Sequence, residues 1–289
     1  MRRRVFLGSL CAAALLPSAV LASTSPRVIP LSWDLAEMLL SLGVSPVGLP
    51  APAWYRSGIV EPPLPANVVD IGLLFQPNYD LLYELRPDLI VATPAHASVR
   101  ASFERIAPTI TLGAYMSDAR PYRAMRGEAV ELGGRIGRTR EAERLISQTE
   151  DIIRQSRITL SGKYAPVCIA EPVDDRHLRL YGSGSMFDEL LSKLGLVNAA
   201  SRDGLVQGAA NIVEMESLAR MPDANLLWIG RDNAAALQSN PVWQQLPFSQ
   251  PAHAATLPMI SSTGALVSVQ RFARAVAQTV PLLSGNHVI

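Results

Sequence analysis

Hydrophobic and polar positions divide the chain into two similar halves around one long helix. Between residues 139 and 160, small and apolar side chains recur every three or four positions, while most charged residues lie off this stripe. The spacing predicts one amphipathic helix, whose stripe contains Ala142, Leu145, Ile146, Thr149, Ile152, Ile153 and Ser156. We expect this helix, over residues 139–161, to join a lobe at 27–138 to a second lobe at 164–289.

Each half alternates short apolar runs with segments of helical periodicity. In the first half we expect strands at 28–31, 46–49, 68–72, 87–92 and 109–112, and helices after Trp33, at 79–85 and at 98–106. The proline-rich segment 51–67 has no period and predicts a surface loop. In the second half we expect strands at 165–170, 177–181 and 225–230, and helices at 185–194 and 267–280. This alternation predicts an α/β fold of two lobes, each a mainly parallel sheet with helices on both faces, joined by one long rigid helix.

Residues 1–22 have the pattern of an export signal. Three arginines at 2–4 precede an uncharged, mainly apolar run, and small residues favour cleavage after Ala22. The run is too short and too interrupted for a membrane span. Lipidation of Cys11 is disfavoured because a leucine precedes it, and the paired arginines also resemble a twin-arginine signal. We expect a mature protein that begins near Ser23 in the periplasm.

Charge and cysteine content narrow the function further. The chain of 289 residues has a net charge of +1, so loss of the three signal arginines leaves the mature protein near −2. Such a balance offers no basic face for nucleic acid. Cys168 is then the one remaining cysteine and lies in an apolar run, which favours a buried structural role. No histidines stand at metal-ligand spacing, so we expect neither a protein metal centre nor a cofactor.

Enzyme motifs are weak. The run Gly182-Ser183-Gly184-Ser185 lacks the lysine of a phosphate-binding loop and the spacing of a nucleophile turn. A turn followed by a helix capped by Ser185 explains it better. A secreted hydrolase stays as a distant alternative that would need a serine, histidine and acid constellation.

Several motifs in the same order along the chain carry a family resemblance. They are Glu61-Pro62-Pro63-Leu64-Pro65, Val69-Asp70-Ile71-Gly72, Gln76-Pro77-Asn78, Arg105-Ile106-Ala107-Pro108, Gly182-Ser183-Gly184-Ser185-Met186-Phe187, and Asn240-Pro241-Val242-Trp243 with the residues up to Phe248. In these stretches the chain resembles the periplasmic substrate-binding proteins of the iron-siderophore and vitamin B12 class, and within it the ferrichrome binders. The resemblance implies a monomer that holds a ferric siderophore, most naturally a hydroxamate, between two lobes. It also implies delivery to an inner-membrane ABC permease and its ATPase, with cobalamin, haem or another iron chelate as alternative ligands.

The chain departs from the ferrichrome binders in the expected pocket. Leu74 stands where those proteins keep an arginine, and His96 stands where they keep a tyrosine that follows a buried strand. We expect His96 to donate a hydrogen bond to a chelate oxygen. Their second-lobe tryptophans correspond here to Ala200, Gln207 and Ser261, whereas Trp33 is retained. A less aromatic cleft suits a smaller or more polar chelate.

Other residues can replace the lost contacts. Trp54, Tyr55 and Arg56 lie in the loop expected at the cleft mouth, where a guanidinium can pair with a chelate oxygen. Arg231 follows a strand at the carboxyl edge of the second sheet, where open α/β sheets bind ligands. The resemblance further implies one acidic residue per lobe for docking to the permease, for which Glu104 and Glu214 are the candidates.

Overall fold

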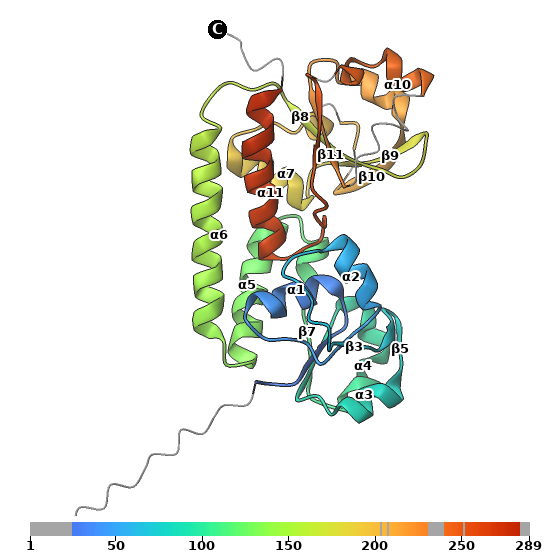
Figure 1. Ribbon diagram of the computed structural model, residues 1–289, viewed down its shortest axis with the longest axis vertical. Helices are drawn as coiled ribbons and strands as arrows, with labels where there is room; N and C mark the ends of the chain where they lie inside the picture. The colour runs from blue at the N-terminus through green and yellow to red at the C-terminus, as the bar shows by residue number, and fades with distance from the viewer. Residues whose placement is uncertain (1–24, 203, 207, 231–239, 251, 284–289) are drawn as a thin grey trace, which may run out of the picture.

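The structure is a computed structural model, and it describes residues 25–202, 204–206, 208–230, 240–250 and 252–283. Two α/β lobes follow one another along the long axis of the molecule, and long helices run beside them (Figure 1). The predicted fold class is therefore present. Within the described residues, no helix combines the length and the hydrophobicity that a membrane span requires.

The N-terminal lobe is built on three parallel strands in the order β1, β6, β7. These strands are β1 (Val28–Pro30), β6 (Leu89–Ala92) and β7 (Thr109–Thr111). Every residue of β6 is buried, as expected of an apolar central strand between layers of helices. Two small pairs lie beside this sheet: β2 (Gly48–Leu49) with β3 (Val69–Asp70), and the hairpin of β4 (Gly72–Leu73) and β5 (Gln76–Pro77).

Short helices connect the strands of this lobe. They are α1 (Trp33–Ser41), α2 (Pro52–Gly58), α3 (Tyr79–Leu85), η1 (Pro94–Val99), α4 (Arg100–Glu104) and η2 (Ala114–Ser117). Helix α1 begins where the Ser32 side chain accepts a hydrogen bond from the Leu35 amide, which satisfies one free donor of its first turn. The prediction of a loop over 51–67 was wrong in part, because α2 occupies its first half. Pro52 opens that helix at a position where its missing N–H costs nothing.

The C-terminal lobe contains a five-stranded sheet in the order β10, β9, β8, β11, β12. The strands are β8 (Val167–Pro172), β9 (His177–Tyr181), β10 (Ala210–Glu214), β11 (Asn225–Ile229) and β12 (Ala254–Leu257). β11 is parallel to β8 and β12, whereas β8, β9 and β10 are antiparallel. This sheet is therefore mixed, since the four residues between β8 and β9 are too few for a crossover and permit only a hairpin.

The remaining helices cover the C-terminal lobe and connect it to the first. They are α5 (Pro121–Arg135), α6 (Thr139–Thr159), α7 (Met186–Leu194), α8 (Ala199–Arg202), η3 (Met215–Arg220), α10 (Pro241–Gln245), η4 (Pro247–Ser249), α11 (Leu266–Thr279) and η5 (Val280–Leu282). Gly195 ends α7 in the left-handed region, at φ 83°. The Ser185 hydroxyl caps the same helix by accepting from the Asp188 amide, as expected from the sequence.

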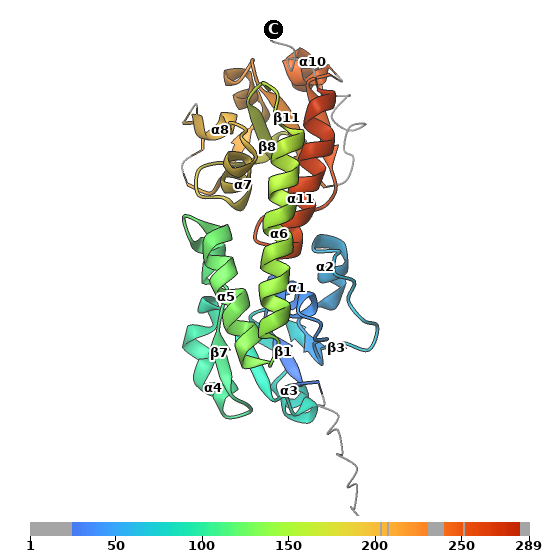
Figure 2. The same cartoon turned by 90° about the vertical axis from the view of Figure 1, so that its left-hand side faces the viewer.

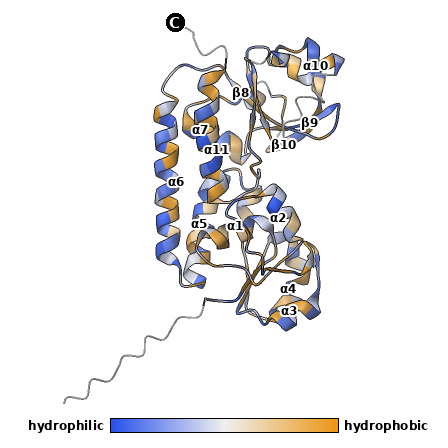
Figure 3. Cartoon of the chain, in the orientation of Figure 1, coloured by the Kyte–Doolittle hydropathy of each residue, from blue (hydrophilic) through white to orange (hydrophobic). Residues whose placement is uncertain are grey.

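Helix α6 matches the long predicted helix, and its alternation of polar and apolar residues is visible in Figure 3. It reaches from the first lobe to the second in both views (Figure 2). Helix α11 packs along it, and the Gln270 amide donates to the Thr149 hydroxyl across this buried contact at 2.9 Å. One hydrophobic cluster includes Leu39, Leu145, Phe187 and Phe272 and so continues through both lobes. Helix α11 also packs against α1, so it adds a contact between the lobes to the connection that α6 makes.

Candidate functional site

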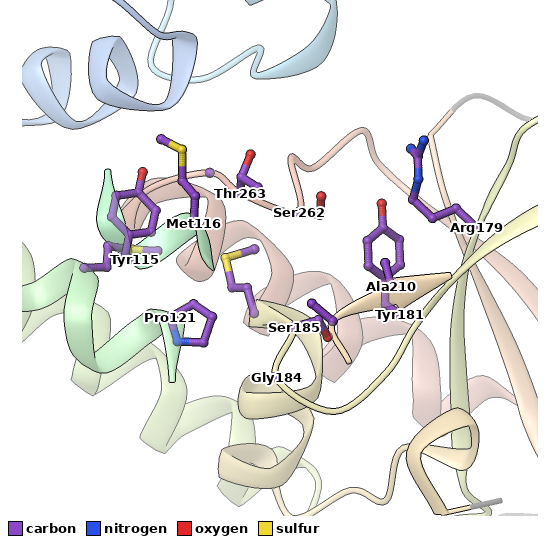
Figure 4. A pocket seen from close by; sticks show the side chains of 14 residues that line it. Tyr115, Met116, Pro121, Arg179, Tyr181, Gly184, Ser185, Ala210, Ser262 and Thr263 are labelled. Carbon is purple, nitrogen blue, oxygen red and sulfur yellow. The ribbon is translucent and has the colours of Figure 1, made fainter. Parts of the chain in front are cut away.

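A cleft between the lobes consists of two adjoining pockets, with cavity volumes of about 250 and about 300 Å³. Both pockets are lined by Arg179, Tyr181, Ser262 and Thr263 from the C-terminal lobe and its connection to α11. The first pocket, shown in Figure 4, adds Tyr115, Met116, Pro121 and Met125 from the N-terminal lobe. The second adds Trp33, Asp34, Trp54 and Leu74 from the same lobe. A ligand in the cleft would therefore contact both lobes.

Two tryptophans form one wall of the second pocket. Trp33 is the first residue of α1 rather than the end of a strand, and its indole N–H donates to the Pro50 carbonyl oxygen at 2.8 Å. Trp54 of α2 stacks on it, with ring centroids 6.1 Å apart and planes inclined by 19°. Trp54 is 65% exposed, so its outer face is open to solvent. The structure thus brings both predicted tryptophans to the cleft.

The neighbours of Trp54 do not join it there. Tyr55 is fully buried in the N-terminal lobe, and its hydroxyl donates to the Pro62 carbonyl oxygen at 2.8 Å. Consecutive residues of a helix point about 100° apart, so Tyr55 faces the lobe core when Trp54 faces the cleft. The prediction that Tyr55 binds ligand was therefore wrong. Arg56 is exposed, is not among the residues that line either pocket, and donates to the Pro65 carbonyl oxygen at 3.4 Å.

His96 lies behind the cleft wall and contacts Leu74, a residue that lines it. It is buried, and its Nδ1 lies 3.2 Å from the Thr93 backbone nitrogen, which can only donate. The proton of the neutral ring therefore belongs on Nε2, which lies 2.9 Å from the Leu74 carbonyl oxygen and donates to it. Both ring nitrogens are occupied, so the prediction that His96 donates to a ligand was wrong. Leu74 itself lines the second pocket.

Arg179 and Tyr181 were not predicted, although a local signal existed. Leu178 and Leu180 of β9 are buried in the lobe core, so the alternate residues emerge on the opposite face, toward the cleft. The Arg179 guanidinium donates to the Glu171 carboxylate at 2.7 Å, and the Tyr181 hydroxyl donates to the same oxygen at 2.9 Å. Burial raises the pKa of Tyr181 to about 12, so its hydroxyl keeps its proton at neutral pH. The remaining N–H groups of Arg179 therefore provide donors in the cleft, where Leu74 offers none.

Two buried carboxyl groups of α1 hold the connection that leads into α11. Asp34 accepts a hydrogen bond from the Ser261 hydroxyl at 3.1 Å, so this serine lies at the cleft as predicted. Burial raises the pKa of Asp34 to about 6, against the lowering effect of that bond. One turn later, Glu37 is fully buried and accepts from the Ala265 amide, the Ser268 amide and the Ser268 hydroxyl at 2.7–2.9 Å. Burial raises the pKa of Glu37 to about 7.

The raised pKa of Asp34 predicts a pH dependence of stability. The folded state binds the Asp34 proton more tightly than the unfolded chain does, so the contribution of this group is complete below about pH 4 and is lost as the pH rises through about 6. We expect Asp34→Asn, which cannot titrate, to lose less melting temperature than the wild type between about pH 4 and about pH 7. Glu37 titrates in an overlapping range and keeps part of the slope in both proteins. Parallel profiles of the two proteins would contradict this reading of Asp34.

The other candidates lie away from the cleft or outside the described residues. Glu104 ends α4, is exposed and pairs with Arg100 at 2.8 Å, while Glu214 is exposed at the end of β10. Ala200 is fully buried in the core of the C-terminal lobe and lines neither pocket. Gln207 and Arg231, like the expected signal at 1–22, lie outside the described residues.

The described part of the chain contains neither a cluster of metal ligands nor an accessible thiol. No three side chains of histidine, cysteine, aspartate or glutamate converge there on a point where they could hold a metal ion. Cys168 is fully buried, and burial raises the pKa of its thiol to about 12. A protonated, enclosed thiol is inert, which fits a packing role.

Comparisons with known proteins agree with this architecture. Residues 28–260 match the periplasmic binding protein family. The chain is 32% identical to the iron(3+)-hydroxamate-binding protein FhuD of Escherichia coli K12 over 253 residues, which cover 86% of this chain and 84% of that protein. It is 24% identical to the Fe(3+) dicitrate-binding periplasmic protein FecB of the same organism, over 82% of this chain and 78% of that one.

Solved structures share the fold. The Fe3+-Desferal-bound siderophore-binding protein FhuD of Vibrio cholerae superposes with a TM-score of 0.79 at 23% identity, over 89% of this chain and 98% of that one. The triscatecholate siderophore-binding protein FeuA of Bacillus subtilis gives 0.69 at 17% identity, over 91% and 94%. The family match over most of the chain, with the two-lobed fold and its cleft, confirms the resemblance seen in the sequence. The chain belongs to the periplasmic binding protein family.

Proposed function

We propose that this protein captures a ferric siderophore of the hydroxamate type in the interlobe cleft and delivers it to an inner-membrane ABC permease with its ATPase. The observation that carries the proposal is the pairing of two kinds of surface in one pocket. The stacked Trp33 and Trp54 supply an apolar wall from one lobe, and the guanidinium of Arg179 supplies hydrogen-bond donors from the other. The similarity to hydroxamate-binding FhuD of Escherichia coli supports the choice of ligand class.

The chemistry of the ligand fits these surfaces. A ferric trihydroxamate presents a largely neutral and partly apolar exterior, with hydroxamate oxygens exposed around the iron. Aromatic faces bury the apolar part, and the N–H groups of Arg179 that are not bonded to Glu171 can donate to the oxygens. The iron arrives already chelated, so the protein needs neither a cofactor nor a metal centre of its own. It acts as a carrier and not as an enzyme.

The cellular setting of the proposal rests on the sequence. Residues 1–22 would direct export, the mature chain would start near Ser23, and a monomer would work in the periplasm. Within it we assign the N-terminal lobe to 27–138, the connecting helix to 139–161 and the C-terminal lobe to 164–289. We keep Glu104 and Glu214 as the docking acids for the permease, since both are exposed and one lies in each lobe.

A quenching titration tests the ligand class. The mature protein would be titrated with a ferric trihydroxamate, a ferric tricatecholate, ferric citrate, haem and cobalamin. Its intrinsic tryptophan fluorescence would be followed, to which Trp33 and Trp54 of the cleft contribute. We expect the ferric trihydroxamate to bind most tightly, and its iron-free form to bind less well because it lacks the compact chelate shape. Tightest binding of haem or cobalamin would move the protein to that ligand class, and no binding of any ferric chelate would overturn the proposal.

Replacing Trp33 with alanine tests the wall of the cleft. We expect more than tenfold weaker binding, because an aromatic contact contributes about 0.5–1.5 kcal/mol beyond the area it buries. Isothermal titration measures the affinity without relying on the removed fluorophore. The matched control is Trp243→Phe, since Trp243 packs against Trp228 inside the C-terminal lobe and lines neither pocket. Unchanged affinity in Trp33→Ala would remove this residue from the site.

A further inference from the structure

The charges of the cleft are few. Among the described residues that line its two pockets, only Asp34, Glu171 and Arg179 carry a formal charge, so acids outnumber bases. Leu74 lines the second pocket together with these three residues and is uncharged. Asp34 is buried at the cleft floor with its hydrogen bond from Ser261, so Glu171 is the acid more open to a ligand.

Arg179, the one arginine among the described lining residues, is already partnered. Its guanidinium donates to Glu171 at 2.7 Å, in a cleft where the side chain of Glu171 is 27% exposed. The partnership lets the remaining N–H groups of Arg179 donate to a ligand oxygen while the pair as a whole has no net charge. An anionic ligand would gain these donors but would also meet the Glu171 carboxylate, and partial desolvation strengthens that repulsion.

We propose that Glu171 determines which ferric trihydroxamates the cleft accepts, by favouring complexes that are neutral or bear an ammonium group over complexes that bear a carboxylate. The inference rests on the proposed function and refines its ligand class. It also gives a reason for the Glu171, Arg179 and Tyr181 cluster, in which one carboxylate oxygen accepts from two donors. The cluster offers hydrogen bonds to the hydroxamate oxygens without creating a cationic site that would bind polyanionic chelates.

The test uses three ligands that differ only in charge. A linear ferric trihydroxamate with a terminal amine is used with that amine free, acetylated or succinylated, so that the complex carries an ammonium, no added charge or a carboxylate. We expect the wild type to bind the ammonium form at least ~10-fold more tightly than the carboxylate form at low salt, with the neutral form between them. The ratio should shrink as the ionic strength rises.

Variants assign this preference to one residue. In Glu171→Gln we expect the ratio between the ammonium and carboxylate forms to fall below about threefold or to reverse, because the repelling charge is gone and the Arg179 charge is no longer compensated, while an oxygen acceptor remains for Arg179. Glu216→Gln is the matched control, since it removes the same charge from an exposed position of the C-terminal lobe outside the cleft, and it should keep the wild-type ratio. Leu74→Arg leaves the cluster intact, adds a cation to the same pocket and should shift the preference toward the carboxylate form.

The outcomes separate the two proposals. Equal binding of all three ligands by the wild type would overturn the inference and leave the proposed function standing. An unchanged ratio in Glu171→Gln, or an equal change in Glu216→Gln, would also overturn it, because long-range charge would then set the preference. Failure of all three ligands to bind would count against the proposed function itself. If Glu171→Gln does not fold, the three ligands still test the inference on the wild type, and equal binding of them overturns it.

Discussion

Glu37→Ala is expected to lower the free energy of unfolding by about 3 kcal/mol or more, because three buried donors lose their acceptor at once. The Ala265 amide, the Ser268 amide and the Ser268 hydroxyl all donate hydrogen bonds to this carboxylate, which is fully buried. An unsatisfied buried donor costs about 1–3 kcal/mol, and the shorter side chain also leaves a cavity. Chemical denaturation of the wild type and the variant measures the difference.

Two further variants make the Glu37 experiment specific. Glu37→Gln keeps one carbonyl oxygen but turns an amide toward the donors, so we expect an intermediate loss. Glu143→Ala removes a glutamate from an exposed helical position and should change the free energy of unfolding by about 0.5 kcal/mol or less. A loss in Glu37→Ala as small as in Glu143→Ala would mean that the contact between α1 and α11 contributes little to stability.

Ile152→Pro is expected to cost about 3 kcal/mol or more, because proline removes a backbone hydrogen bond and its ring clashes with the preceding turn. Ile152 lies in the middle of α6, partly buried against the cluster that runs through both lobes. A kink there would change how the lobes face each other, so ligand affinity should fall together with the melting temperature. Ile152→Ala is the control, since it removes side-chain packing and leaves the helix backbone unchanged. Wild-type melting and binding in Ile152→Pro would show that α6 does not hold the lobes in place.

Elements with a strong local period were predictable. The stripe of α6 and the boundaries of α3, Tyr79–Leu85, follow from side-chain spacing along a few turns, and the structure reproduces both. The two-lobed α/β fold followed from the alternation of strands and helices. The mixed parallel and antiparallel order of the second sheet could not be predicted from the sequence. Its strands β10 and β12 are short, have a weak hydrophobic pattern and pair with strands distant in sequence.

Side-chain direction decided which of the predicted site residues line the cleft. Trp54 and Tyr55 are adjacent and similar in chemistry, and only the rotation of α2 sends one to the cleft and the other to the core. His96 looked available from its loop sequence, yet Thr93 and Leu74 occupy both its nitrogens. Arg179 could have been found from the alternation within β9. Knowing that its face meets the other lobe requires the tertiary structure.

The hydrogen bonds between Glu37 of α1 and the start of α11 mean that the N-terminal lobe is completed only after the end of the chain has been made. Glu37 lies near the beginning of the mature chain, while its three donors belong to residues 265 and 268, close to its end. During vectorial synthesis, all the strands of the N-terminal lobe are made long before residues 265 and 268. Until those residues are made, the carboxyl group of Glu37 lacks the three donors that it has in the folded protein. The lobe that is translated first is thus completed no earlier than the second, and a chain truncated before α11 would carry an incomplete N-terminal lobe as well as an incomplete C-terminal one.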